Sequence, residues 1–255
     1  MSGSLVIVGL GPGSSDLLTP AAARALQAAT DLVGYGPYLD RIPQANLDQR
    51  RHSSGNRVEI DRARHALALA AEGRKVAVVS GGDPGVFAMA AAVFEAIEVG
   101  DPDWRELDIR VEPGITAMLA AAAEVGAPLG ADFCAISLSD NLKSWETIER
   151  RLRAAAEGDF VIALYNPASR ARPYQLGRAF DLLRATKSPQ TIVLFVRSAA
   201  TPESGVVMTV LAEADPALAD MRTLVIIGAA ATRLISRKGR RPWVYTPRAE
   251  HEAVR

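Results

Sequence analysis

The sequence predicts an α/β protein, because short apolar runs alternate along the chain with segments of helical periodicity. Several of these runs are almost wholly apolar, which is typical of strands covered on both faces. Two junctions support the pattern: Thr19-Pro20 and Asp83-Pro84 each place a capping side chain before a proline suited to the first helical position. We expect two α/β domains, residues 1–115 and 116–255.

The elements follow in order along the chain. The expected strands share an apolar, β-rich composition and are residues 5–10, 31–35, 75–80, 107–111, 133–138, 159–165, 190–196, 205–210 and 223–228. Helical spacing places two apolar sets on one helix face each: Phe87, Ala90, Phe94 and Ile97, then Trp145, Ile148, Leu152 and Ala155. Residues 111–128 predict a Pro-Gly turn followed by an alanine-rich helix, and we place the boundary between the domains after residue 115 in this segment. Residues 233–255 show no strong period and are expected to cover the surface or to be partly loose.

Composition narrows the function. The 255 residues carry 29 basic and 29 acidic side chains, and this neutrality argues against broad nucleic-acid binding. One cysteine and three scattered histidines offer no metal-ligand spacing, so no metal is expected. The apolar run at 5–10 is too short for a signal peptide, and no stretch has the length of a membrane span. We expect a soluble cytoplasmic protein without a membrane partner.

The first glycine loop lies in "VIVGLGPGSSDLLTP", residues 6–20. A dinucleotide fingerprint needs a third glycine where Ser14 stands, and an acidic residue about 20 positions later that is also missing. A phosphate-binding P-loop needs a lysine that this loop lacks. These gaps exclude a nicotinamide oxidoreductase and a P-loop enzyme. A turn that serves packing alone remains the alternative.

Two further glycine turns follow expected strands. Gly81-Gly82-Asp83-Pro84 comes after residues 75–80, and "EPGIT" at 112–116 offers Thr116 as a helix cap. Ligands of α/β sheets bind beyond the carboxyl ends of the strands, so three such turns predict one shared cleft. Asp83 either caps a helix or accepts hydrogen bonds from an ammonium or hydroxyl group of a ligand.

Taken together, these motifs resemble the tetrapyrrole (corrin/porphyrin) methyltransferase family. The resemblance rests on "VGLGPGSSDLLTPAAARAL", "SGGDPGVF", "VEPGITAMLAAAAEVGAPL", "ISLSD", "LYNP" and "LVIIGAA", which occur in this order over nearly the whole chain. It implies two α/β domains with the active-site cleft between them. It also implies S-adenosyl-L-methionine as cofactor, S-adenosyl-L-homocysteine as its product, and a homodimer.

Two segments, "DLVGYGPYLDRI" and "ALYNPASRARPYQL", are most similar to family members that methylate precorrin-3B at carbon 17. Those members contract the ring to precorrin-4 in cobalamin (vitamin B12) biosynthesis. Three alternatives stay open. The substrate could be cobalt-factor III of the anaerobic branch, or a macromolecule methylated by the same fold, or the chain could bind its ligands without catalysis.

The resemblance also implies site residues. Those on the cofactor side are Pro12, Gly81, Gly82, Asp83, Val86, Thr116, Ala117, Asn166 and Ser198, with Arg197 as an alternative to Ser198. A precorrin carries many carboxylates, which favour arginine; the expected substrate-side residues are Gly11, Gly13, Arg51, Arg170 and Arg172. The catalytic residue is unknown, because Gly36 stands where a relative has an aspartate that is a candidate base. His52, Asp40 and Tyr38 are the candidates nearby.

Overall fold

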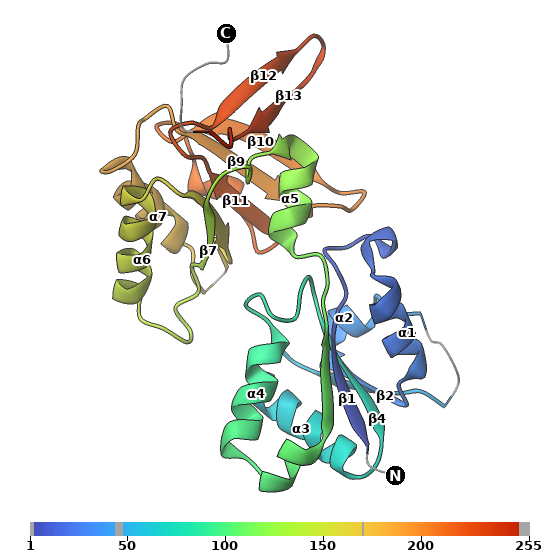
Figure 1. Cartoon of the computed structure of the whole chain (residues 1–255). Helices are drawn as coiled ribbons and strands as arrows, with labels where there is room; N and C mark the ends of the chain where they lie inside the picture. The colour runs from blue at the N-terminus through green and yellow to red at the C-terminus, as the bar shows by residue number, and fades with distance from the viewer. Residues whose placement is uncertain (1–2, 44–47, 170, 250–255) are drawn as a thin grey trace. The chain divides into compact units, whose positions relative to one another are not determined.

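The computed structural model describes residues 3–43, 48–169 and 171–249 (Figure 1). The chain divides into two compact units, Met1–Ala117 and Met118–Arg255, which are described separately below. Each unit contains a sheet and helices, so the predicted α/β class is confirmed. No helix in the described ranges is long and apolar enough to cross a bilayer.

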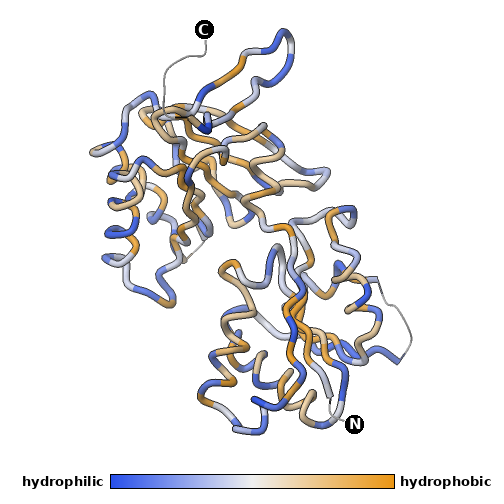
Figure 2. Tube along the Cα trace, in the orientation of Figure 1, coloured by the Kyte–Doolittle hydropathy of each residue, from blue (hydrophilic) through white to orange (hydrophobic). Residues whose placement is uncertain are grey.

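The first unit is built on a sheet of five parallel strands in the order β3-β2-β4-β1-β5. The strands are β1 (Ser4–Gly9), β2 (Asp31–Tyr35), β3 (Arg50–Ser54), β4 (Lys75–Ser80) and β5 (Asp108–Glu112). The central strands β1 and β4 are apolar and buried on both faces, as their uninterrupted hydrophobic runs predict (Figure 2). Parallel pairing brings the carboxyl ends of all five strands to one edge.

Helices cover both faces of this sheet (Figure 1). One face carries α3 (Glu59–Ala71) and α4 (Met89–Val99), and the other carries α1 (Pro20–Ala28) and the short α2 (Gly36–Leu39). Single turns η1 (Ser15–Leu17) and η2 (Pro102–Glu106) complete the unit. Thr19 caps α1 by accepting a hydrogen bond from the Ala22 N–H at 3.1 Å, so that predicted cap is confirmed.

The region around α4 corrects two predictions. Asp83 is not a helix cap, since α4 begins six residues later and its N-cap Ala88 makes no side-chain bond. Phe87 precedes the helix and Phe94 is 51% exposed, so the two aromatic residues of the expected face are not buried, whereas Ala90 is buried and Ile97 packs against the core. The buried side consists of Met89, Ala90, Ala92, Val93 and Ala96. Small side chains let α4 pack closely against α3, where phenyl rings would hold the helices apart.

The second unit contains a mixed sheet in the order β10-β9-β11-β8-β7. Its strands are β7 (Phe133–Ser137), β8 (Val161–Tyr165), β9 (Ile192–Arg197), β10 (Gly205–Val210) and β11 (Thr223–Ile227). Because β11 is antiparallel to both β8 and β9, strands β7, β8 and β9 run in the same direction and end at one edge.

The helices described in this unit are α5 (Ala117–Val125), whose first residue ends the first unit, α6 (Trp145–Glu157), α7 (Gln175–Arg184) and the single turn η3 (Pro216–Leu218). The predicted apolar face of α6 is confirmed, because Trp145, Ile148, Leu152 and Ala155 are all buried in the core beneath it.

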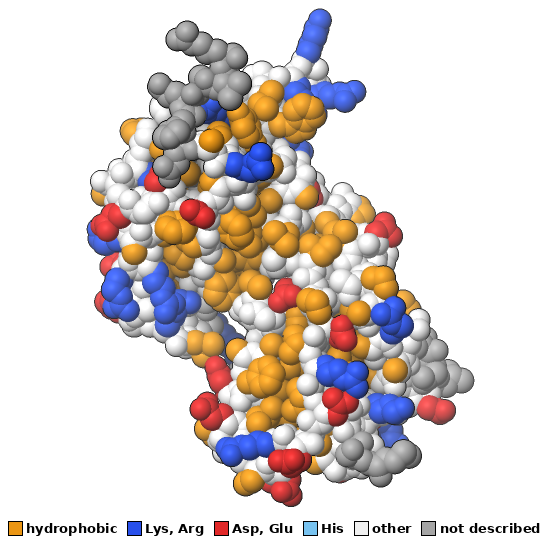
Figure 3. All heavy atoms as spheres, viewed as in Figure 1, with side chains coloured by type: hydrophobic (Ala, Val, Ile, Leu, Met, Phe, Trp, Pro, Cys, Tyr) orange, Lys and Arg blue, Asp and Glu red, His pale blue; other side chains and the backbone are white. Residues whose placement is uncertain are grey.

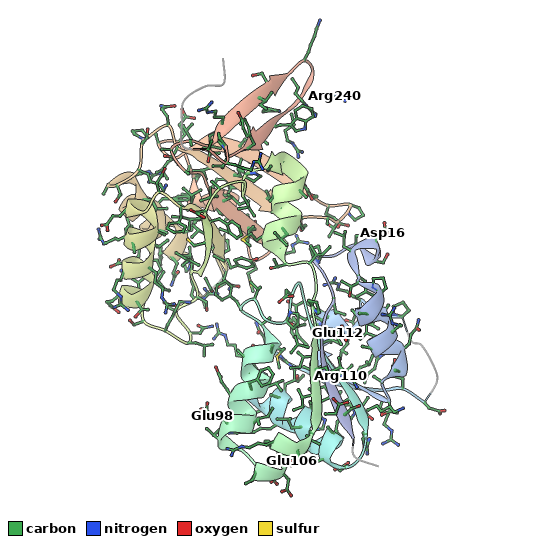
Figure 4. The ribbon with its side chains drawn as sticks, in the orientation of Figure 1. Asp16, Glu98, Glu106, Arg110, Glu112 and Arg240 are labelled. Carbon is green, nitrogen blue, oxygen red and sulfur yellow. The ribbon has the colours of Figure 1, made fainter. Side chains whose placement is uncertain are left out.

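The segment from residue 233, expected to cover the surface or to be partly loose, forms an ordered hairpin over residues 233–245. Strands β12 (Arg233–Arg237) and β13 (Arg240–Tyr245) pair antiparallel, and β13 also pairs with β6 (Gly126–Ala127). Gly239 makes the turn with a φ of 66°. Lys and Arg side chains gather at the tip, where Arg240 is labelled (Figures 3 and 4). Sequence periodicity missed these strands because basic residues flank only short apolar stretches in each. Residues 250–255 lie outside the described ranges.

Candidate functional site

The three glycine turns of the first unit meet at the carboxyl ends of the adjacent strands β4, β1 and β5. The Gly11 N–H donates to the Gly82 carbonyl at 3.1 Å, and the Gly82 N–H donates to the Gly11 carbonyl at 2.9 Å. Both residues have left-handed φ angles, +69° and +67°, which side-chain-bearing residues adopt at a cost. The paired bonds therefore require glycine at both positions and fix the first turn against the second.

Asp83 joins the second turn to the third. Its Oδ1 accepts from the Gly85 N–H at 2.8 Å, and its Oδ2 accepts from the Gly114 N–H at 3.0 Å. A carboxylate has about four lone-pair sites, so Asp83 can hold these two turns and still accept hydrogen bonds from a ligand. These two hydrogen bonds to the backbone are the physical reason that Asp83 does not cap α4.

Most residues predicted for the cofactor and substrate in the first unit belong to these turns. The half-buried ones are Pro12, Gly13, Gly81, Gly82, Asp83, Val86 and Ala117, and the buried ones are Gly11 and Thr116. Glu112, labelled in Figure 4, ends β5 just before the third turn. The structure thus brings Gly11, Gly82, Asp83 and Gly114 into direct contact, which the sequence only suggested.

Tyr38 lies beside the second turn. It comes from α2, directly after β2, and its ring packs on Gly81. A Cβ atom added to Gly81 would lie 2.7 Å from the Tyr38 Cζ and 2.9 Å from its hydroxyl oxygen. The Tyr35 ring meets the Tyr38 ring edge-on, with centroids 5.5 Å apart. Asp40, the other candidate from this segment, is exposed at the C-cap of α2.

His52 has partners at both ring nitrogens. Its Nε2 lies 2.8 Å from Oδ1 of the buried Asp31, and its Nδ1 lies 3.0 Å from Nε2 of His65. Burial raises the pKa of Asp31, but the hydrogen bonds from His52, Thr30 and Arg74 outweigh burial and hold that pKa below its usual value. The buried carboxylate is therefore ionised, and His52 helps to satisfy it. Catalysis by His52 stays a prediction that no described contact with the glycine turns supports.

The predicted substrate-side arginines differ in what they contact. Arg51 donates to the carbonyls of Leu39 and Ile42 at 2.9 and 2.6 Å, and so closes the end of α2. Arg170 lies outside the described residues. Arg172 places Nη1 3.5 Å from the Asn166 carbonyl, a long contact, while its buried Nε has no hydrogen-bond partner among the described residues.

The second unit gathers its predicted residues at the ends of β7, β8 and β9. Asn166 follows β8 and donates to the Ser137 hydroxyl at the end of β7, at 2.9 Å. Ser198 follows β9, and its buried Oγ has no hydrogen-bond partner within the part of the chain that the structure describes. Asn166 and Ser198 both have left-handed φ angles, 52° and 49°. Buried polar atoms without a partner cost free energy, so the Ser198 Oγ and the Arg172 Nε each call for a partner that the described residues do not supply.

Two positioning side chains were not predicted. Glu124 of α5 accepts from the Ala200 N–H at 2.6 Å and from the Ser204 hydroxyl at 2.5 Å, which holds the loop after Ser198. The signal was present, because Glu124 is the single charged residue of the alanine-rich segment 117–125. Arg41 donates to the carbonyls of Leu10 and Gly11, both at 3.1 Å, and no sequence pattern indicated this. The described ranges contain no group of three His, Cys, Asp or Glu that could hold a metal ion.

Comparison with known proteins agrees with this arrangement. The family model of the tetrapyrrole (corrin/porphyrin) methylases matches residues 4–215. A protein of Sinorhizobium named precorrin-3B C(17)-methyltransferase is 57% identical over 97% of both chains. One of Salmonella typhimurium, named "Probable cobalt-factor III C(17)-methyltransferase", is 45% identical over 88% of this chain and 92% of its own. The crystal structure of the methyltransferase CobJ superposes with a TM-score of 0.91 at 56% identity, over 96% of this chain and all of that one. The chain therefore belongs to the tetrapyrrole (corrin/porphyrin) methylases.

Proposed function

We propose that this chain transfers a methyl group from S-adenosyl-L-methionine to carbon 17 of precorrin-3B, with contraction of the macrocycle to precorrin-4, in cobalamin biosynthesis. The observation that carries the proposal is the 57% identity, over 97% of both chains, with the Sinorhizobium protein of that name. The joined glycine turns and the unpartnered polar atoms of the second unit support it.

The residues present fit S-adenosyl-L-methionine. This cofactor has an ammonium, a sulfonium and hydroxyl groups but no phosphate, and the glycine turns offer bare backbone without a phosphate-binding lysine. We assign Asp83 and the turns around Gly11 and Gly82 to its polar groups. For Asn166 and Ser198, the cofactor role rests on the family resemblance alone.

When bound, the cofactor supplies a methyl group on sulfur that leaves readily. The protein then has to hold the attacking carbon and the methyl group in line and to exclude water, which accounts for much of the rate of such a transfer. An acid–base triad is not needed for this step. The backbone turns fixed by the Gly11–Gly82 bonds and by Asp83 provide the rigid surface that such alignment requires.

The substrate's carboxylates call for arginine. Arg172 has an unpartnered Nε and is the better placed of the described candidates, because two nitrogens of Arg51 already hold the end of α2. Ring contraction also requires proton transfers. Among Tyr38, Asp40 and His52, Tyr38 is the candidate whose hydroxyl borders the glycine turns, so we assign proton transfer to Tyr38.

One alternative substrate has a specific observation in its favour. The 45% identity with the Salmonella protein makes cobalt-factor III, the cobalt-containing counterpart of precorrin-3B, the second candidate substrate. From the family resemblance we also infer a homodimer that works in the cytoplasm.

Turnover with methyl-labelled cofactor tests the proposal. Precorrin-3B and cobalt-factor III, each made enzymatically, are incubated with the protein, and the tetrapyrroles are examined by mass spectrometry and absorption spectroscopy. We expect precorrin-3B to gain one methyl group and to acquire a contracted-ring spectrum. Methylation of cobalt-factor III alone would move the enzyme to the anaerobic branch. Methylation of neither would refute both assignments.

A further inference from the structure

Arg41 ties α2 to the first glycine turn. Its Nη2 donates to the carbonyl oxygens of Leu10 and Gly11, both at 3.1 Å. The Gly11 carbonyl also accepts the N–H of Gly82 at 2.9 Å. One guanidinium nitrogen thus contacts the backbone at the point where the first and second turns are joined.

The charge of Arg41 matters as well as its hydrogen bonds. Burial lowers the pKa of the guanidinium, which Tyr38 partly offsets. An arginine starts from so high a pKa that it remains charged at neutral pH. Carbonyl oxygens carry partial negative charge and repel a carboxylate-rich ligand, and a cation bonded to them reduces this repulsion.

We propose that Arg41 is a positioning residue for binding of the anionic macrocycle. It orients the carbonyls of Leu10 and Gly11 and offsets their negative potential, so that the turn at Pro12 and Gly13 accepts a polycarboxylate. This rests on the proposed function, because the polycarboxylate is the tetrapyrrole substrate. Arg41 contacts backbone rather than the reacting atoms, and so it is not a catalytic residue.

The test compares Arg41→Gln and Arg41→Lys with a matched control. Arg184 of α7 also donates to two backbone carbonyls, those of Leu211 at 3.1 Å and Ala214 at 2.9 Å, but it lies in the second unit. Arg184→Gln therefore removes the same kind of contact while leaving every hydrogen bond described for the glycine turns in place. For each full-length variant we would measure amide exchange over residues 8–14 and 80–86, S-adenosyl-L-homocysteine affinity, and KM for tetrapyrrole and cofactor.

For Arg41→Gln we expect faster exchange in both segments and a KM for the tetrapyrrole raised about tenfold, as for the loss of one charge-assisted hydrogen bond. Cofactor affinity should also fall, because the same turns are assigned to the cofactor, but by less than the tetrapyrrole KM rises, because S-adenosyl-L-methionine is not a polyanion. Arg41→Lys keeps the charge and should bring the KM for the tetrapyrrole most of the way back to the wild-type value. Arg184→Gln should leave both segments and both KM values unchanged.

Two results would overturn the inference. Unchanged exchange in Arg41→Gln would show that the residue does not fix the turn. An equal rise in both KM values, not recovered by lysine, would show that its charge has no special effect on the anionic ligand. If the wild-type protein methylates no tetrapyrrole, the proposed function fails separately, and the exchange data still decide whether Arg41 fixes the turn.

Discussion

Replacing Asp83 with alanine is expected to weaken cofactor binding through the shape of the turns. The substitution removes two hydrogen bonds from a carboxylate to backbone N–H groups, one to Gly85 and one to Gly114. The bond to Gly85 is exposed and contributes little, whereas the bond to Gly114 is half-buried. A hydrogen bond to a charged group is worth about 1.5–3 kcal/mol, so we expect the free energy of unfolding to fall by about 2 kcal/mol. If the bound state needs the same turn geometry, affinity falls by about tenfold or more.

Calorimetric titration with S-adenosyl-L-homocysteine and urea unfolding measure the two effects separately. Asp83→Asn keeps one acceptor oxygen, so it should lie between wild type and alanine in both measurements. Asp101→Ala is the matched control, because Asp101 accepts one N–H in a similar turn at the start of η2. That variant should lose about 0.5–1 kcal/mol of stability, as for a helix cap, and keep full affinity. Affinity within twofold of wild type in Asp83→Ala would remove Asp83 from the site.

Three further substitutions test other contacts. Gly81→Ala should lower the free energy of unfolding by about 1–3 kcal/mol, because the added methyl group overpacks against Tyr38. Adding Tyr38→Leu should restore more than half of the lost free energy, measured by urea unfolding. No recovery would refute the contact. Glu124→Gln should cost about 1–2 kcal/mol, because the amide has one acceptor oxygen and its NH2 group cannot accept the second donor. It should also weaken S-adenosyl-L-homocysteine binding measured by calorimetry; unchanged affinity would separate that loop from the ligand. The folded pKa of Asp31 lies below its unfolded value of about 4, so its contribution to stability is present above that pH and is lost as pH falls through the folded pKa. His52→Leu should therefore flatten the acid limb of a stability–pH curve while His52→Gln, which still donates, should preserve more of it; identical curves would refute the role of His52.

The elements that the sequence predicted correctly depend on local chemistry. Thr19-Pro20 formed the expected cap, since a hydroxyl and a proline act within one helical turn. The apolar runs of β1 and β4 became buried central strands for the same kind of reason. Asp83-Pro84 carries the same local signal as Thr19-Pro20, yet Asp83 bonds to Gly114, which is 31 residues away. A competing partner distant in sequence cannot be read from a capping motif.

The sequence by itself determined the α/β class, the three glycine turns and the family to which the chain belongs. The spacing of apolar residues and the residue types in the turns encode these features directly. Only the tertiary structure decided which groups are already occupied. It showed that His52 satisfies the buried Asp31, that Arg51 closes α2, and that no described residue bonds to the Ser198 hydroxyl. It also revealed Arg41, whose hydrogen bonds span about 30 residues of chain. Hydrogen-bond partners are set by the packing of whole elements, and one sequence holds no local pattern for them.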